Sequence, residues 1–419
     1  TQHAVAETLG LQHFDEDDLY KALDRLAEAQ EHIEDALYRR TVRQRGGAPT
    51  VVLYDVTSSY LEGDQNELAA FGYSRDKKPS KAQIVIGLLT TAEGEPLAVH
   101  VYEGNTSDPV TVPEQVHTLQ TRFGITAVVF VGDRGMVKAK GKHTLTTAGF
   151  RYITALTTPQ VRRLLQTQVL RAEWFTTHVH EVVHGAVRLI LRRSDALRQQ
   201  AARRRADKWA KLQRLITARN AFVETAKRAK PDTGLRTLQA WVKRHKLAAF
   251  VQVSLHDGRL MATLDPAAQA EATVLDGCYV LETDVPQTAL DAQAVHDRYR
   301  DLYEVEQDFR TMKTGLLEVR PIFVRKAPRT RAHVLVTMLA LKVVRELRRA
   351  LVAAFGTTDD DKMAVTVEEA LLALARLCLL TYHIQGTAVT RLPTTDERQK
   401  AILAALGTPL PPPRSLRQM

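Results

Sequence analysis

Residues 128–137 read VVFVGDRGMV, an apolar run that leads through Gly132 directly to an acid, Asp133. A second stretch, TVVLYDVTSSY at residues 50–60, places Asp55 inside another apolar run. Runs of this length and composition are typical of buried β-strands. A carboxylate at the edge of a core is costly unless a positive group offsets its charge. The sequence therefore predicts two strand-borne acids that need a cationic partner.

The residues around these two runs alternate between strand-like and helical patterns. Strands are expected at residues 51–57, 82–89, 97–101, 127–131 and 152–155, and helices at residues 11–45, 112–121 and 138–148. Gly46 and Gly47 are expected to end the first helix. Three hairpin-like strands followed by alternating helices and strands indicate an α/β fold with a mixed sheet flanked by helices.

The pattern changes after Pro159, where two hairpins are expected to turn at His184-Gly185 and at Asp257-Gly258. Between them runs a helical stretch in which residues 188–230 hold 14 Lys and Arg against 3 Asp and Glu. Such a stretch could be a solvated helix face. The size of the imbalance favours an arm that contacts phosphates.

The last third of the chain is predicted to be mostly helical. A long helix is expected to start at Thr288, with Asp291 as its capping-box acid, and to run to Thr314, where Gly315 ends it. Further helices are expected at residues 331–351 and 368–382. The tail at residues 407–419 is rich in proline and is expected to be extended or disordered.

Composition narrows the class of protein. The chain has 419 residues, which predicts two or three structural units, and its net charge of +10 favours a polyanionic partner such as nucleic acid. No apolar run is long enough to span a bilayer, and no signal peptide is visible. Cys278 and Cys378 show no zinc-site spacing and are interpreted as core thiols in a reducing cytoplasm.

Glu306 is a third candidate acid, on the long helix. Tyr299, Glu306 and Lys313 are spaced seven residues apart, so they share one helical stripe with steps of about 10.5 Å. The neighbouring stripe is apolar, which places Glu306 on the shoulder of the core-facing side, where it could meet Asp55 and Asp133. Three carboxylates there would repel unless divalent cations lay among them, and oxygen ligands suit Mg²⁺ or Mn²⁺.

Each acid also has a simpler interpretation. An Asp after a strand, such as Asp133, is commonly a helix cap or a turn residue, and Asp55 alone could have a structural role. Glu306 alone could pair with Arg310 one helical turn on. The three acids therefore need support from the rest of the sequence.

The stretch YEVEQDFRTMK at residues 303–313, read together with Tyr299, resembles the signature Y-x2-R-x3-E-x6-K of a large group of bacterial insertion-sequence transposases. Tyr299, Glu306 and Lys313 have the required spacing, but Leu302 stands at the Arg position, and neither Arg298 nor Arg300 lies on the same face. The blocks GYSRDKKPSKAQIVIGLL, GNTSDP and VGDRGMV are similar to the DDE catalytic domain of this group, in the same order. The segment VRPIFVRKAPRTRAHVLVTMLALKV is similar to the one after the signature helix.

The resemblance implies a ribonuclease H-like fold in which Asp55, Asp133 and Glu306 form the DDE triad and bind two Mg²⁺ ions, with Mn²⁺ expected to substitute. It also implies a mostly β insertion between Asp133 and Glu306. The expected activity is cut-and-paste transposition at terminal inverted repeats. The expected partners are double-stranded transposon ends and target DNA, bound by a homodimer. The expected location is a bacterial cytoplasm, at the nucleoid when the protein is bound to DNA. The candidate DNA-binding residues are Tyr299, Lys313, Arg134, Arg203, Arg204, Arg205, Lys208 and Lys211.

Two other functions remain open from the sequence: a related metal-dependent nuclease that cuts without joining, and a catalytically silent DNA-binding regulator derived from a transposase.

The chain is expected to divide into five regions. These are a helical N-terminal region at 1–48 that is a candidate for DNA binding or dimerisation, the first part of the catalytic domain at 49–158, an insertion of hairpins and basic helices at 159–287, the second part of the catalytic domain at 288–351, and a helical C-terminal region with the tail at 352–419.

Overall fold

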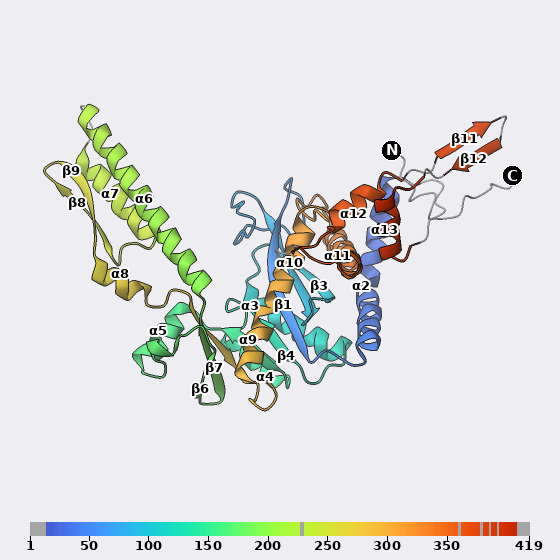
Figure 1. Cartoon of the computed structure of the whole chain (residues 1–419), viewed down its shortest axis with the longest axis horizontal. Coiled ribbons are helices and arrows are strands. Elements are labelled where there is room, and N and C mark those ends of the chain that lie inside the picture. The colour runs from blue at the N-terminus through green and yellow to red at the C-terminus, as the bar shows by residue number, and fades with distance from the viewer. Residues whose placement is uncertain are drawn as a thin grey trace. The chain divides into compact units, whose positions relative to one another are not determined.

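The computed structural model describes residues 14–226, 230–358, 362–377, 380–384, 387–391 and 394–408. The chain divides into two compact units, one formed by Thr1–Phe150 with Arg300–Met419 and the other by Arg151–Tyr299. Figure 1 shows the elements of both units. No helix in the described ranges is long and apolar enough to cross a membrane.

The first unit holds the mixed sheet that carries the candidate acids. Its strands lie in the order β3-β2-β1-β4, with β1 antiparallel to β2 and parallel to β4. This arrangement agrees with the ribonuclease H-like mixed sheet that was expected. The strands are β1 (Val51–Tyr60), β2 (Gln83–Thr91), β3 (Pro96–Glu103) and β4 (Val129–Gly132).

Strand β1 runs through the core of this unit. Eight of its ten residues are buried, and only Asp55 and Tyr60 keep partial exposure. The Tyr54 ring lies over Gly87 of β2, so that a Cβ at Gly87 would collide with the Tyr54 hydroxyl. Glycine is therefore required at this point of the sheet, and the close packing makes β1 a rigid support for Asp55.

Helices cover the sheet of the first unit. Helix α11 packs against α2 and β3, and α10 packs against β1 (Figure 1). The helices are α2 (Glu16–Arg45), α3 (Asp108–His117), followed by one π-helical turn (Thr118–Arg122), α4 (Ala139–Thr147), α10 (Leu302–Lys313), α11 (Ala327–Phe355), α12 (Val367–Leu374) and α13 (Glu397–Ala405).

The N-terminal helix α2 is fixed to this unit by a buried carboxylate. Glu34 is 0% exposed; its Oε2 lies 3.0 Å from Nη1 of Arg122, and its Oε1 accepts a hydrogen bond of 3.1 Å from the backbone N–H of Val99. Arg122 also binds Asp35 of α2. Gly46 has a φ of 74° and ends the helix, as expected.

The second unit is built from antiparallel strands and a helical hairpin. Its strands lie in the order β5-β10-β7-β6, and a separate hairpin pairs β8 with β9. Helices α6 and α7 pack on that hairpin through Leu212, Ile216, Leu238 and Leu260. The elements are β5 (Arg151–Ala155), α5 (Thr158–Gln166), a 3-10 turn (Ala172–Trp174), β6 (His180–His184), β7 (Val187–Arg193), α6 (Asp195–Thr225), α7 (Pro231–Arg244), β8 (Val251–His256), β9 (Arg259–Leu264), α8 (Pro266–Thr273), β10 (Cys278–Thr283) and α9 (Ala292–Arg300).

Three expectations about helices are wrong. The helix expected from Thr288 to Thr314 is two helices, α9 and α10, with Asp301 between them. The first of them is capped by Asp291, not by Thr288, because Asp291 accepts a 2.7 Å hydrogen bond from the N–H of Ala294. The helix expected at 368–382 ends at Leu374. Tyr382 lies instead in a strand, because the β-branched and aromatic residues there suit the β11–β12 hairpin (Leu380–Ile384 and Thr387–Arg391).

The third correction concerns the start of the basic stretch. Arg188 lies in β7, is buried, and pairs with Glu181 at 2.7 Å, so it does not belong to a solvated helix. Cys278 is half-buried and free, so it is not a fully buried core thiol. Cys378 and residues 409–419 of the proline-rich tail lie outside the described residues.

Candidate active site

The middle of β1 and the end of β4 place two acids side by side. The parallel register pairs Leu53 with Val131 and Tyr54 with Gly132, so Asp55 and Asp133 are the next residues on the two strands. Neighbouring strands lie about 4.8 Å apart, which makes these two residues neighbours at one edge of the parallel pair. Asp133 follows β4 directly, as the sequence predicted.

Asp133 is exposed and begins a turn. Its Oδ1 accepts a 2.7 Å hydrogen bond from the backbone N–H of Arg134, and its carbonyl accepts from the N–H of Met136. It does not cap the next helix, because α4 starts at Ala139 with Lys138 as its N-cap. Gly132 is required here, since a Cβ would lie 2.8 Å from Cγ2 of Val137.

Glu306 comes from helix α10, which packs against β1. Val305, Phe309 and Met312 face the core, and Glu306 is exposed beside them. No ion pair joins Glu306 to Arg310 within the part of the chain that the structure describes. The simple salt-bridge interpretation of Glu306 is therefore not supported.

The position of α10 is fixed by a second ion-pair network. Arg345 of α11 lies 2.7 Å from the buried Asp308 and 3.3 Å from Glu304, the two acids that flank Glu306 on the helix. Burial raises the pKa of Asp308 to about 6, and the Arg345 guanidinium opposes that rise. This network anchors the helix segment that carries Glu306.

The electrostatics of Asp55 link the three acids. Burial raises the pKa of its carboxyl to about 7; the backbone N–H of Val56 and the Arg75 guanidinium oppose the rise, whereas the negative charges of Asp133 and Glu306 add to it. Both acids therefore act as like-charged neighbours of Asp55. This is the environment in which a bound cation would relieve the most repulsion.

The residues present suit a divalent cation by their chemistry. All three side chains offer only oxygen, the donor that Mg²⁺ and Mn²⁺ prefer, and Asp55 is a half-buried carboxylate with an electrostatic cost to offset. In the described ranges, no three His, Cys, Asp or Glu side chains are already gathered as a metal-binding group. The expected separation of the three carboxylates stays a prediction.

The loop between β1 and β2 supplies an arginine that the sequence analysis did not single out. Nη2 of Arg75 lies 2.5 Å from Oδ1 of Asp108, and its backbone N–H donates to Oγ of Ser58 on β1 at 2.9 Å. Asp108 in turn lies close to Asp133, because a Cβ on Gly135 would be 3.5 Å from Oδ2 of Asp108 and 3.7 Å from Oδ2 of Asp133. The signal was the block YSRDKK, in which basic residues crowd one loop.

Lys313 lies at the end of α10, two turns past Glu306, as its spacing predicted. It is not a free ammonium: its Nζ lies 2.9 Å from Oδ1 of Asp76, which also binds Arg320 at 2.6 Å. The sequence analysis missed both of these partners. Tyr299 lies on α9, in the other unit, so the three signature residues do not lie on one continuous helix. Arg134 is exposed directly after Asp133.

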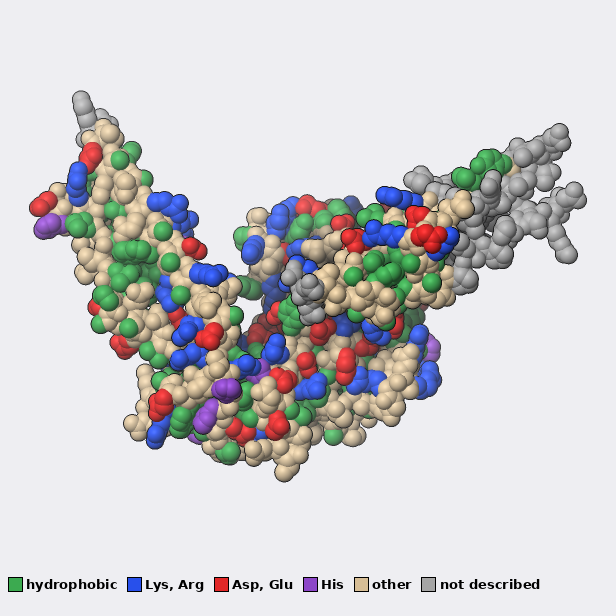
Figure 2. Space-filling model, viewed as in Figure 1, with side chains coloured by type: hydrophobic (Ala, Val, Ile, Leu, Met, Phe, Trp, Pro, Cys, Tyr) green, Lys and Arg blue, Asp and Glu red, His purple; other side chains and the backbone are tan. Residues whose placement is uncertain are grey.

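The candidate DNA-binding cations of α6 fall into two groups. Arg203, Arg204 and Lys211 are exposed, and Figure 2 shows Lys and Arg side chains along this helix. Arg205 instead pairs with Asp276 at 2.5 Å, and Lys208 donates to the carbonyl of His245 at 3.1 Å.

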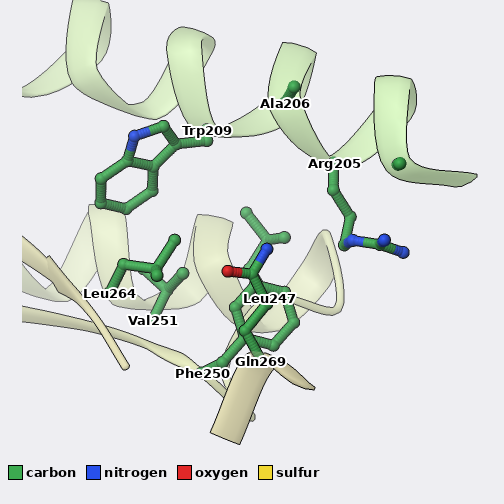
Figure 3. A pocket seen from close by; sticks show the side chains of 9 residues that line it. Arg205, Ala206, Trp209, Leu247, Phe250, Val251, Leu264 and Gln269 are labelled. Atoms are coloured by element: carbon green, nitrogen blue, oxygen red, sulfur yellow. The ribbon is translucent and has the colours of Figure 1, made fainter. Parts of the chain in front are cut away.

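A pocket of about 250 Å³ lies beside Arg205. It is lined by Arg205, Trp209, Phe250 and Leu264 together with five neighbours, all in the second unit, and Figure 3 shows Arg205 at its edge. The guanidinium is therefore part of the packing of this unit. Of the candidate cations on α6, Arg203, Arg204 and Lys211 are the ones available for a partner.

One comparison with known proteins identifies the family of this chain. A search of curated proteins gives no match. Among solved structures, the piggyBac transposase synaptic complex with hairpin DNA is similar at a TM-score of 0.41 and 8% identity, covering 94% of this chain and 71% of that one. The family model described as a transposase DDE domain matches residues 46–341, a range that includes β1, β4 and α10 with their three acids. The chain therefore belongs to the transposases with a DDE domain.

Proposed function

We propose that this transposase cuts and joins DNA at the terminal inverted repeats of an insertion sequence, by a cut-and-paste route. Asp55, Asp133 and Glu306 would hold two divalent cations, Mg²⁺ in the cell. The observation that carries this proposal is the parallel register of β1 and β4, which makes Asp55 and Asp133 neighbours, with Glu306 on a helix that packs against β1. DDE transposases generally use divalent metal ions, which accords with this donor set.

Each of the three acids has a separate support. Asp55 stands on a buried strand, Asp133 is oriented by the N–H of Arg134, and Glu306 is carried by a helix that Arg345 anchors. Sites built on rigid elements hold their reactive groups more closely than sites on loops. When bound, the cations would lower the pKa of a water molecule and stabilise negative charge on the phosphodiester oxygens.

The reaction proposed has two steps. Hydrolysis breaks the bond between phosphorus and the 3′-oxygen, leaving a 5′-phosphate and a free 3′-hydroxyl. That hydroxyl then attacks a phosphodiester in a second DNA strand and displaces another 3′-oxygen, so that one bond forms for each bond that breaks. Tyr299, Lys313 and Arg134 would hold phosphates near the cut, and a homodimer would hold two DNA ends.

DNA is the substrate that best suits the charge of the chain. The net charge is +10, and Arg203, Arg204 and Lys211 are exposed on one helix, where their charges can neutralise phosphates without reading bases. These contacts would hold the DNA backbone in register. They would not select its sequence.

A metal-dependent nuclease that does not join DNA is the second candidate, and it would use the same acids. A silent DNA-binding regulator is the third; Leu302 at the signature Arg position is the one observation that favours it. The discriminating experiment incubates the protein with DNA carrying the element's ends in Mn²⁺ and in Mg²⁺. Cut and joined products support the proposal, cut products alone support the nuclease, and bound but intact DNA supports the regulator.

A further inference from the structure

Two cations share one buried carboxylate beside the active site. Asp76 is only 2% exposed, and its Oδ1 lies 2.9 Å from Nζ of Lys313 and 2.6 Å from Nη1 of Arg320. Its other oxygen accepts a 3.2 Å hydrogen bond from the backbone N–H of Tyr60, the last residue of β1. Asp76 thus joins the end of β1 to the end of α10 and to the segment that follows it.

The cluster has one positive charge in excess, since a single carboxylate faces two cations. Lys313 is 10% exposed and Arg320 is 28% exposed, so the excess charge is reachable from solvent. Nε of Arg320 donates to the carbonyl of Lys313 at 3.2 Å, whereas its Nη2 has no acceptor among the described residues. Two of the three guanidinium nitrogens of Arg320 are therefore held by the protein, and the N–H donors of the third are arranged to bind an anion.

The surroundings of Lys313 also indicate a site for an anion. Burial lowers the pKa of its ammonium, Asp76 opposes this, and the charges of Arg320 and Arg75 lower the pKa further. Arg75 also acts on Asp55, which shows that the cluster lies within electrostatic reach of the active site. A phosphate bound there would relieve the crowding of positive charge.

We propose that Asp76 is a positioning residue that gathers Lys313 and Arg320 into a cradle for one backbone phosphate of the DNA end, and that Arg320 binds this phosphate directly. The proposal rests on the function proposed above, and it adds a phosphate-binding residue that the helix signature does not contain. Asp76 holds both cations in place. Its single negative charge offsets only one of the two positive charges, so a net positive charge remains to attract a DNA phosphate.

The charge balance of the cradle gives a specific test in binding experiments. The slope of log K against log salt is measured with a labelled random-sequence duplex by fluorescence anisotropy. Arg320→Ala or Lys313→Ala leaves a neutral pair, so the slope should shrink by about 1. Adding Asp76→Asn to Lys313→Ala frees Arg320 and should restore the slope. When Asp76→Asn is added to the variant with both Lys313→Ala and Arg320→Ala, the slope should stay reduced, because the cluster no longer holds a positive side chain that could contact a phosphate.

Cleavage separates positioning from a purely structural role. Asp76→Asn should lower the rate at saturating DNA in Mn²⁺ without raising the KM for DNA, because the cations remain but are no longer fixed. Arg320→Lys should retain more activity than Arg320→Ala. Arg325→Ala, an exposed arginine five residues on, removes the same charge outside the cluster and should leave the rate unchanged. Thermal unfolding of every variant checks that it is folded.

The outcomes distinguish the cradle from the function on which it rests. If wild-type protein cuts DNA while Arg320→Ala keeps the wild-type slope and rate, the cradle is wrong and the transposase function stands. If Asp76→Asn fails to restore the slope of Lys313→Ala, its positioning role is wrong. Wild-type protein that neither binds nor cuts DNA would overturn both.

Discussion

Asp55 combines burial with two like-charged neighbours, and its titration follows from that environment. Burial raises the pKa of its carboxyl to about 7 in the folded protein. The unfolded chain loses the same proton near pH 4. Between these values the folded state binds more protons, so the free energy of unfolding falls as the pH rises from about 4 to about 7. Above pH 7 the full cost of the carboxylate is present.

Asp55→Asn should therefore raise the melting temperature of the metal-free protein at pH 8 and change it little at pH 4, because only the ionised carboxylate is costly. Added Mn²⁺ should stabilise the wild type at pH 8 but not this variant, because a ligand that binds the folded state raises its stability. Calorimetry at both pH values measures the effects. Asp257→Asn, at a side chain that is 90% exposed, is the control. Equal melting temperatures for wild type and Asp55→Asn at pH 8 would contradict this account.

Some residues of the candidate site were predictable because each has a local signal. Asp55 and Asp133 interrupt or follow apolar runs, and the seven-residue spacing put Glu306 and Lys313 on one stripe of α10. Asp76 has no such signal: its partner Lys313 lies 237 positions away, and nothing in the local pattern specifies that pairing. The sequence pattern around Lys313 therefore gives no sign of an ion pair, and no reason to expect that replacing Lys313 would affect folding. Its ion pair with a buried carboxylate predicts a cost in stability instead.

At the scale of elements, α2 depends on one buried acid. Glu34→Ala would leave Arg122 with one fewer partner and the N–H of Val99 without its acceptor. Removing one member of a buried ion pair costs about 3–5 kcal/mol. The variant should lose that much in a denaturant titration, whereas Glu28→Ala, at an exposed position of the same helix, should lose almost nothing. A loss below about 1 kcal/mol for Glu34→Ala would mean that this network does not hold the helix.

Helix α6 allows its two groups of cations to be tested separately. Replacing Arg203 and Arg204 with Ala should weaken binding to all DNA sequences alike and reduce the slope of log K against log salt by about 2, because both side chains are exposed. Arg205→Ala should leave the slope unchanged and lower the melting temperature, because Arg205 is paired with Asp276. An unchanged slope in the double variant would leave a solvated helix face as the better interpretation.

Element boundaries show where sequence patterns stop being informative. The hairpin turns at Gly185 and Gly258 were predictable because glycine adopts a positive φ there. The break at Asp301 was not, because the same helical periodicity continues through both α9 and α10. The strand at Leu380–Ile384 was missed because its apolar residues also fit a helix, and the β-hairpin pairing that decides between the two is not visible in a short window.

At the scale of the whole molecule, the net charge of +10 predicts that DNA affinity depends strongly on salt. The logarithm of the binding constant should fall linearly with the logarithm of salt concentration, because bound cations are released from DNA when its phosphates are neutralised. Anisotropy titrations with duplexes of unrelated sequence measure this. Affinity that does not change with salt would be incompatible with backbone contacts by the exposed cations.

We propose that Asp55, Asp133 and Glu306 form one metal site when DNA is bound. Anomalous scattering from Mn²⁺ in crystals of the DNA complex would locate the ions. We expect two manganese peaks about 3.5–4 Å apart, bounded by these three carboxylates, and their loss in Glu306→Gln. Manganese bound elsewhere, or three carboxylates too far apart to share the two ions, would contradict it.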